Sequence, residues 1–302
     1  MRNFLLTLFA ILSLQFSSTI SADNTESCVA NGSSAIEYPH SSSSNSYTDN
    51  YCAAEPDYYG MTFYELGLCT STPTAPTTSS NLITTNCSTV MTSTAGSLVE
   101  IANGVTGSLG GTQTRPANGT YTHGYIRLSN AFLIEASKEF WSDDMTINNL
   151  SGDYTDNSDV GKYCATRAVT YNNDGSSGTA STICDSTAPT AGRLTARLVD
   201  LSGGDRSGCM STSTACGGAI TVTGGTLNAY LLDSNNYLAS SSSEVTGLIG
   251  VQEFTSPVIV TEDSASMDAQ IIVTKSMTVS NNGSNTGVAF DSGPFSVVLT
   301  IN

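Results

Sequence analysis

Hydrophobic and polar residues alternate with a period of two along most of the chain, whereas the three-to-four spacing of an amphipathic helix is almost absent. The alternation is clear in residues 59–68 (YGMTFYELGL) and 120–128 (TYTHGYIRL). Residues 131–136 continue or pair with the second segment after a kink at Ser129 and Asn130. We predict a β-strand in each. Further strands are predicted at residues 162–171, 193–201, 219–222 and 227–232.

The C-terminal third carries the clearest strand pattern. Residues 267–279 place six apolar side chains on one face, and Lys275 is the lone interruption: Met267, Ala269, Ile271, Val273, Met277 and Val279. A turn is predicted at residues 281–283 (NNG). Residues 295–301 then place Phe295, Val297, Leu299 and Ile301 on one face. Such a strand either closes the protein's own sheet or is donated to a neighbour. We favour closure of its own sheet.

Many short strands separated by Gly and Asn turns predict an all-β fold, an antiparallel β-sandwich of the immunoglobulin-like or prealbumin-like kind. Its loops are long and rich in Ser, Thr and Gly. We assign residues 57–302 to one elaborated sandwich domain and residues 23–56 to a Ser-rich N-terminal lead-in. The acidic stretch at residues 143–159 marks a candidate sub-boundary, and it fits a long loop between sheets equally well.

Residues 1–22 have the pattern of a secretory signal peptide. Arg2 precedes an uncharged apolar run at residues 4–16, and a polar, small-residue stretch ends at Ala22. The apolar run is shorter than the ~20 residues that a membrane-spanning helix needs. We therefore expect cleavage after Ala22 and no membrane insertion of the mature chain. The expected location is extracellular or at the cell surface, with the periplasm as the alternative.

All eight cysteines follow this leader, and an even number of cysteines in an exported chain indicates a disulfide framework. The sequence does not decide among the many pairings. Spacing favours neighbours: Cys28 with Cys52, Cys69 with Cys87, Cys164 with Cys184, and Cys209 with Cys216. No CxxC motif is present, which disfavours thioredoxin-type exchange and structural zinc ribbons.

The chain is acidic throughout, with 10 Lys and Arg against 26 Asp and Glu and a net charge of −16. Removal of the leader takes away Arg2, so the balance becomes 9 − 26 = −17. Such a surface repels phosphate backbones, so nucleic acid is excluded as an expected partner. The expected partners are other surface proteins, glycans or further copies of the chain.

Catalytic chemistry is weakly represented. The chain has two histidines, His40 and His123, and a hydrolase centred on His123 would need a Ser nucleophile and an orienting acid that the sequence does not single out. Residues 204–208 (GDRSG) do not match G-x-S-x-G, and we interpret them as a glycine turn before Cys209. We expect a protein that is not an enzyme.

Two sets of residues are candidates for ligand binding. Asp153, Asp156 and Asp159 offer hard oxygen ligands for calcium, although the spacing is not that of an EF-hand loop and a solvated turn is the favoured interpretation. No other cofactor is expected. Tyr121, Tyr125 and Trp141 could stack on sugar faces if exposed, although half-buried strand tyrosines are commoner.

The layout of residues 59–136 resembles a bacterial family of exported domains of unknown function. Members combine a valine-rich strand, a D-L-x-x-L-x-N-G segment and P-x-G-x-Y-x-x-I-R-L. The residues that match the last element are Pro116, Gly119, Tyr121, Ile126, Arg127 and Leu128. Pro116 and Gly119 are one residue further apart than in the pattern, and Glu100 and Ile101 stand where Asp-Leu is usual. The resemblance implies an extracytoplasmic, prealbumin-type or carbohydrate-binding-like sandwich of a Gram-negative surface protein, without established catalytic residues.

These observations lead to one favoured function and two alternatives. We expect an exported, non-enzymatic structural or adhesive protein of the cell surface or extracellular space. The first alternative is a glycan-binding module assisted by calcium. The second is an exported hydrolase that uses His123.

Overall fold

The structure is a computed structural model. It describes residues 5–7, 26–40, 47, 50–102, 105–106, 109–143, 147–152, 160–173, 180–201, 208–209, 220–222, 224–281, 287–293 and 295–301. Among these residues the regular secondary structure is β-strand, apart from one short 3₁₀ helix at Ser242–Glu244, and no α-helix is present. The predicted all-β fold is confirmed.

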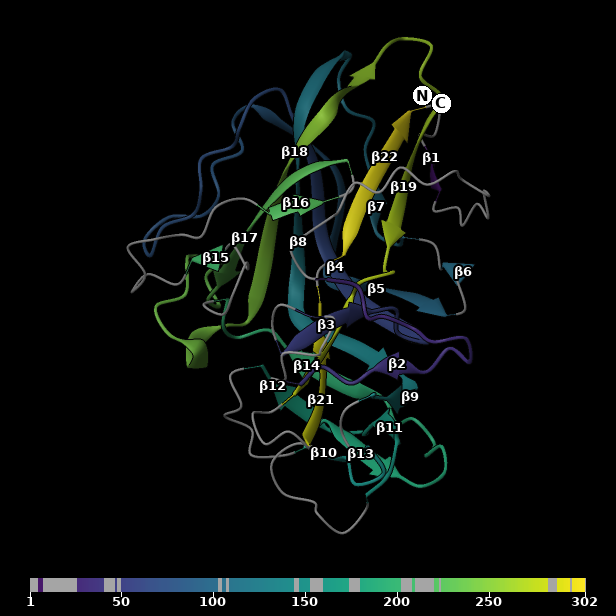
Figure 1. The fold of residues 1–302 in the computed structure, drawn as a ribbon. Coiled ribbons are helices and arrows are strands. Elements are labelled where there is room, and N and C mark those ends of the chain that lie inside the picture. Colours follow the sequence, from purple (N-terminus) through teal and green to yellow (C-terminus); the bar gives the residue numbers. More distant parts are fainter. Residues whose placement is uncertain are drawn as a thin grey trace.

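One large, curved sheet forms the first layer of the molecule (Figure 1). Its main path is β15 (Gly208–Cys209), β17 (Gly225–Leu232), β18 (Gly247–Val260), β8 (Gly119–Glu135), β4 (Tyr58–Cys69), β5 (Cys87–Ala102) and β6 (Val105–Thr106). Four short strands extend it: β7 (Thr112–Gln113), β12 (Thr170–Asn172), β14 (Leu194–Arg197) and β16 (Ile220–Val222). The central strands β17, β18, β8, β4 and β5 pair antiparallel.

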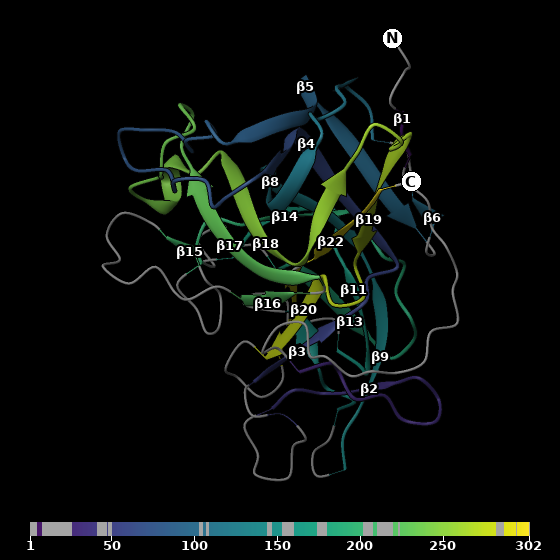
Figure 2. The same cartoon turned by 90° about the horizontal axis from the view of Figure 1, so that it is seen from above.

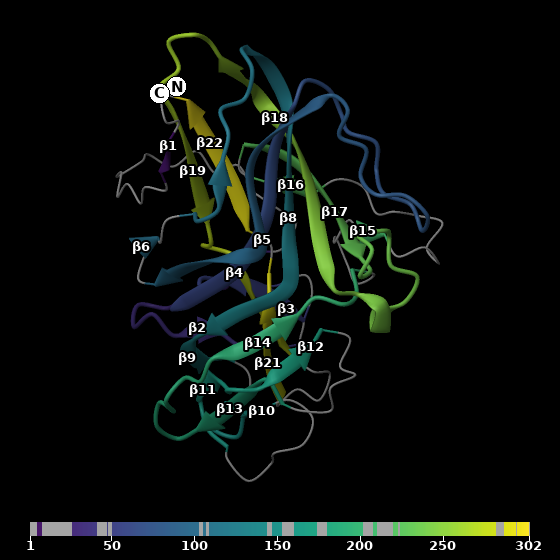
Figure 3. The same cartoon turned by 180° about the vertical axis from the view of Figure 1, so that it is seen from behind.

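Three smaller sheets form the other parts of the sandwich. The first consists of β1 (Leu5–Thr7), β19 (Ser266–Ile272) and β22 (Ser296–Ile301). The second consists of β10 (Ser151–Gly152), β21 (Gly287–Ser292), β20 (Met277–Asn281) and β3 (Tyr51–Ala54). The third consists of β13 (Thr182–Asp185), β11 (Tyr163–Thr166), β9 (Ser137–Trp141) and β2 (Ile36–Glu37). Figure 3 shows β19 and β22 at one end of the long strands and the other two small sheets at the opposite end. Seen from above in Figure 2, β22 lies between β18 and β19.

Aromatic rings join the layers. The Tyr59 ring on β4 lies 5.8 Å from Phe132 on β8 and 6.5 Å from Phe295, measured between ring centroids. Phe140 and Phe290 stack at 6.4 Å between two of the smaller sheets. The core therefore lies between the large sheet and the smaller ones, and the opposite face of the large sheet points away from it.

The terminal strand closes the protein's own sheet, as favoured from the sequence. β22 pairs antiparallel with β19, from Met267 opposite Ile301 to Ile272 opposite Ser296. Its apolar face packs against the core as partly buried side chains. β1, which pairs parallel with β19, belongs to the predicted leader, so cleavage after Ala22 would leave β19 and β22 as a two-stranded unit.

Three strand predictions need correction. The single strand predicted at residues 267–279 is two strands, β19 and β20, because the chain turns where Ser276 N donates to Val273 O at 3.1 Å. The strand predicted at 162–171 is also two, β11 and β12. The strand predicted at 193–201 ends early as β14. β8 continues through Ser129 and Asn130, and its pairing with β4 shifts register there, from Phe63 opposite Leu128 to Met61 opposite Phe132.

Residues on both sides of the predicted boundary at 57 build the sandwich. β2 and β3 lie in the predicted lead-in, and each joins one of the small sheets. Tyr38 is fully buried, and its hydroxyl donates to Gly287 O at 2.9 Å. In the candidate sub-boundary, β10 pairs with β21, and residues 144–146 and 153–159 lie outside the described part.

The described part of the chain contains three disulfides, and they are the expected neighbour pairs: Cys28–Cys52, Cys69–Cys87 and Cys164–Cys184. The second joins β4 to β5, and the third joins β11 to β13, each at directly paired positions. Cys216, and with it the expected Cys209–Cys216 bridge, lies outside the described residues. Such bridges form and persist in oxidising compartments.

Candidate functional site

The outer face of the large sheet carries a second, smaller group of buried side chains. Strand register fixes its membership, because residues paired across neighbouring strands share a face. Glu65, Arg127 and Ile249 form one such row across β4, β8 and β18. Tyr125 pairs with Gly67 in the next row. The apolar members of this outer cluster are Cys69, Tyr125, Leu232, Ile249 and Val251.

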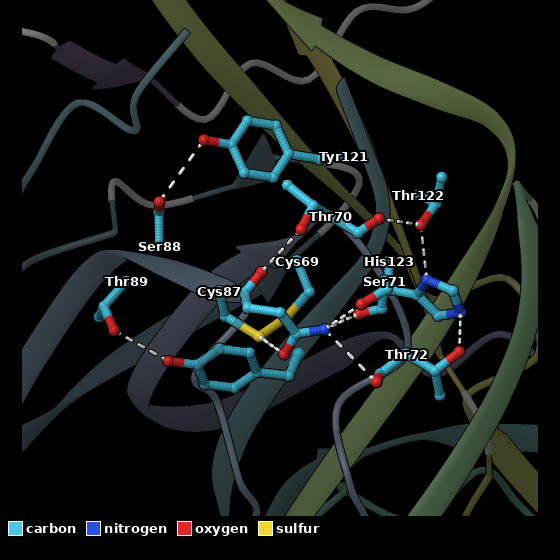
Figure 4. The surroundings of a disulfide bond; sticks show 12 residues. Cys69, Thr70, Ser71, Thr72, Cys87, Ser88, Thr89, Tyr121, Thr122 and His123 are labelled. Carbon is cyan, nitrogen blue, oxygen red and sulfur yellow. Dashed lines mark hydrogen bonds between the residues drawn. A yellow bond between two sulfur atoms is a disulfide. The ribbon is translucent and has the colours of Figure 1, made fainter. Parts of the chain in front are cut away.

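A stapled loop covers part of this face. Cys69–Cys87 closes residues 70–86, and Figure 4 shows the surroundings of the bridge. The Asn86 amide donates to Ser71 O at 2.5 Å and to Ser71 Oγ at 2.6 Å. Thr74 and Ile83 exchange backbone hydrogen bonds further along. The loop is thus held at its base and in its middle, and it carries Leu82 onto the outer cluster.

A second loop, residues 233–238, stands opposite. Oδ1 of Asp233 accepts hydrogen bonds from Asn235 N at 2.8 Å and Tyr237 N at 2.9 Å, which closes a tight turn. Leu238 N donates to Thr77 O at 2.9 Å. With its amide turned to donate, Asn81 reaches Asn235 O at 3.0 Å. These bonds tie the two loops together.

A cavity of about 220 Å³ lies between the two loops and the outer face of the sheet. Its wall mixes charged, amide, hydroxyl and apolar groups from Glu65, Asn81, Leu82, Thr84, Tyr125, Arg127, Leu232, Asn236 and Ile249. We call it the Glu65–Arg127 pocket. Such a mixture of polar and apolar groups can contact a small polar molecule on several sides.

Glu65 is held in place by hydroxyl groups. The Tyr125 hydroxyl donates to Glu65 Oε1 at 2.5 Å, and Thr89 Oγ1 lies 3.5 Å from the same oxygen. Burial raises the pKa of Tyr125 well above its ordinary value, and the bond to Glu65 raises it further. Tyr125 therefore remains a neutral donor, and Glu65 Oε1 accepts one short hydrogen bond from it.

The Arg127 side chain is positioned by its contacts with Glu65 and Tyr64. Its Nε lies 3.7 Å from Glu65 Oε2, and its Cζ lies 5.1 Å from the centroid of the Tyr64 ring. The first distance is too long for a hydrogen bond. Within the described residues the Arg127 guanidinium donates no hydrogen bond, although only 28% of its side chain is exposed. Its fork of N–H donors is thus available to a ligand.

The two tyrosines considered for sugar stacking are buried on β8. Tyr121 and Tyr125 are 2% and 3% exposed, and Tyr125 lines the Glu65–Arg127 pocket. The Tyr121 hydroxyl donates to Ala117 O at 2.8 Å. Trp141 is partly buried on β9, in one of the small sheets, so it is not grouped with the two tyrosines.

His123 does not have the surroundings of a catalytic base. Its Nε2 lies 2.9 Å from Thr72 Oγ1 and its Nδ1 lies 2.8 Å from Thr122 Oγ1 (Figure 4). Both ring nitrogens are thus occupied by threonine hydroxyls. Among the described residues, neither a serine nor a carboxylate bonds to this ring, as a triad would require. Residues 202–207, which include most of the GDRSG segment, lie outside the described part.

Metal binding gains no support from the described chain. Asp153, Asp156 and Asp159, the calcium candidates, lie outside it. In the ranges that the structure covers, no three His, Cys, Asp or Glu side chains gather closely enough to hold a metal ion.

Sequence reasoning missed Glu65 and Arg127, although a signal was present. Each is a single charge in an apolar strand, in TFYELGL and GYIRL. Alternation along residues 120–128 places Arg127 on the same face as Tyr125. A charge on the face shared with a large aromatic residue was the available indication of a polar site.

Comparisons with protein-family models, curated proteins and solved structures find no match to this chain. In the described residues, no helix has the length and hydropathy of a membrane span.

Proposed function

We propose that this protein is an exported, non-enzymatic adhesive protein, secreted or held at the cell surface, that binds a glycan through the Glu65–Arg127 pocket. The leader pattern at residues 1–22 and the disulfide framework support export. The all-β sandwich supports a binding or structural role, because a rigid scaffold that presents loops is a common way to build a binding site.

The observation that carries this proposal is the guanidinium of Arg127, which lines the pocket and donates no hydrogen bond within the described residues. The Arg127 side chain is 28% exposed, so its N–H groups are open to a ligand in the pocket. A disulfide and two linked loops cover the partly buried guanidinium of Arg127, and its N–H groups donate no hydrogen bond within the described residues. A ligand that offers acceptors would complete the arrangement.

The proposal is tested with protein exported by an expressing cell and applied to a glycan array and to glycan-coated particles. Arg127→Ala should lose at least tenfold in binding to every positive glycan. The matched control is Arg193→Ala, which removes the same charge at the C-terminal end of β8, where Arg193 pairs with Glu135. Unchanged array binding in Arg127→Ala would contradict the proposal. Binding to no glycan, together with concentration-dependent self-assembly, would instead favour the purely structural role.

A further inference from the structure

We propose that the pocket takes an uncharged sugar residue with two neighbouring hydroxyl groups, one accepting from Arg127 and the other donating to Glu65. The inference rests on the proposed function and names the ligand class of the same site. It follows from three properties of the pocket: its open hydrogen-bonding positions, its charge balance and its apolar wall.

The open positions are one donor group and one acceptor oxygen, side by side. Glu65 Oε1 already accepts from Tyr125 at 2.5 Å. Among the described residues Oε2 accepts no hydrogen bond, and it lies 3.7 Å from Arg127 Nε. The terminal N–H groups of Arg127 have no acceptor in the described residues. A hydroxyl group both donates and accepts, so two adjacent sugar hydroxyls can satisfy both positions at once.

The charge balance favours an uncharged ligand. Arg127 and Glu65 carry opposite charges 3.7 Å apart, so their charges compensate one another. An anionic sugar would add negative charge beside Glu65 on a chain that already carries −16. An amino acid would have to separate the pair and give up the hydration of both its own charges. Neutral hydroxyls avoid both costs.

The apolar wall provides a surface for the sugar ring. Leu82 from the stapled loop, Leu232 at the end of β17 and Ile249 on β18 line the pocket together with the polar groups. The carbon-bound hydrogens of a sugar ring form an apolar surface that can pack against such side chains. Asn81 is exposed at the rim, beside partly buried Asn236. A cavity of about 220 Å³ with a polar rim suits a single terminal or branch residue of a larger glycan.

The test uses the intact exported protein and ligand-observed NMR titrations with a defined panel. The panel contains the methyl glycosides of glucose, galactose and mannose, their deoxy analogues, methyl glucuronide as the anion and serine as the zwitterion. We expect saturable binding of at least one neutral glycoside. Removing one of its neighbouring hydroxyls should weaken binding at least tenfold, and the anion and zwitterion should compete poorly.

Two variants locate the binding in the pocket. Arg127→Lys keeps the charge but removes the fork, and Glu65→Gln keeps the shape but removes the acceptor charge. Each variant should weaken binding of the neutral sugar at least tenfold, whereas the control Arg193→Lys should leave that binding unchanged. Thermal unfolding curves and intact mass must show that every variant is folded with its bridges formed. Glu65→Ala replaces Glu65→Gln if the latter fails to fold.

Each contrary outcome has a distinct meaning. Preferential binding of the glucuronide or serine overturns the neutral-sugar inference, as does binding of nothing in the panel. If either of these outcomes is found and Arg127→Ala still abolishes glycan-array binding, the neutral-sugar inference fails but the proposed adhesive function stands. Neutral-sugar binding that is unaffected by Arg127→Lys overturns the inference and places the site elsewhere.

Discussion

The ring of Tyr125 lies directly over Gly67 on the neighbouring strand: a Cβ built on Gly67 would stand 2.2 Å from Cε1 of that ring. The absence of a side chain on β4 gives the ring its place. With the ring there, the Tyr125 hydroxyl reaches Glu65 Oε1 at 2.5 Å. A glycine in one strand thus orients the acid of the pocket through a tyrosine in the next.

Replacing Gly67 by alanine should therefore destabilise the protein. The added methyl group must displace a buried ring, and such overpacking costs about 1–3 kcal/mol. Urea unfolding gives the change in free energy. Gly32→Ala is the matched control, because a Cβ at Gly32 has no atom within 4 Å. Equal effects of the two substitutions would contradict the role assigned to Gly67.

Tyr125→Phe should lower stability and weaken glycan binding without changing the fold. Glu65 Oε1 loses its short donor, and leaving a partly buried acceptor unsatisfied costs about 1–3 kcal/mol. Tyr230→Phe provides the comparison, since Tyr230 packs against the same outer cluster but lies outside the pocket lining. Array binding and urea unfolding measure the two effects. If Tyr230→Phe weakens binding as much as Tyr125→Phe, the hydrogen bond to Glu65 is not what positions the acid.

Alkaline titration should reveal buried phenols. Burial raises the pKa values of Tyr38, Tyr59 and Tyr125 above the value of about 10 expected in the unfolded chain. Because the folded pKa values are the higher ones, this contribution to stability is complete below about pH 10 and declines as the pH rises above it. Phenolate absorbance from these residues should appear together with loss of the near-ultraviolet circular dichroism signal. Their ionisation at about pH 10 in a protein that is still folded would disagree with this account.

Removing either of two similar disulfides should lower stability, but removing only one of them should also abolish glycan binding. Cys69–Cys87 and Cys164–Cys184 close loops of similar length, with sequence separations of 18 and 20, but only the first closes the loop that covers the pocket. Replacing either pair by serine should cost about 2–4 kcal/mol of stability. Only the Cys69→Ser, Cys87→Ser variant should also lose glycan binding at temperatures where both variants are folded. Loss of binding in both would contradict a specific role for the loop at residues 70–86.

The strands of this fold were largely predictable, and the pocket was not. Alternation located β4, β8, β17 and β22, because each strand buries one face. The same pattern hid the turn after β19: Val273 and Met277 are four residues apart, so both still match a period of two.

The pocket depends on relationships that a single strand does not contain. Glu65 and Arg127 come together through the register between β4 and β8, and the covering loop depends on the Cys69–Cys87 pairing. Strand alternation fixes the face of a residue but not its neighbour on the next strand. The burial of Tyr121 and Tyr125 likewise depends on what covers the outer face, which their own segment does not show.

The most direct test of the binding site is to follow the side-chain methyl groups by NMR while methyl glycosides of neutral sugars are added. If the Glu65–Arg127 pocket is the site, the methyl signals of Leu82, Leu232 and Ile249 should shift together and saturably. Leu98 and Ile259, which are 46% and 58% exposed and lie outside the pocket lining, should not shift. Saturable shifts at Leu98 or Ile259, with the three pocket residues unchanged, would contradict the assignment of this pocket as the binding site.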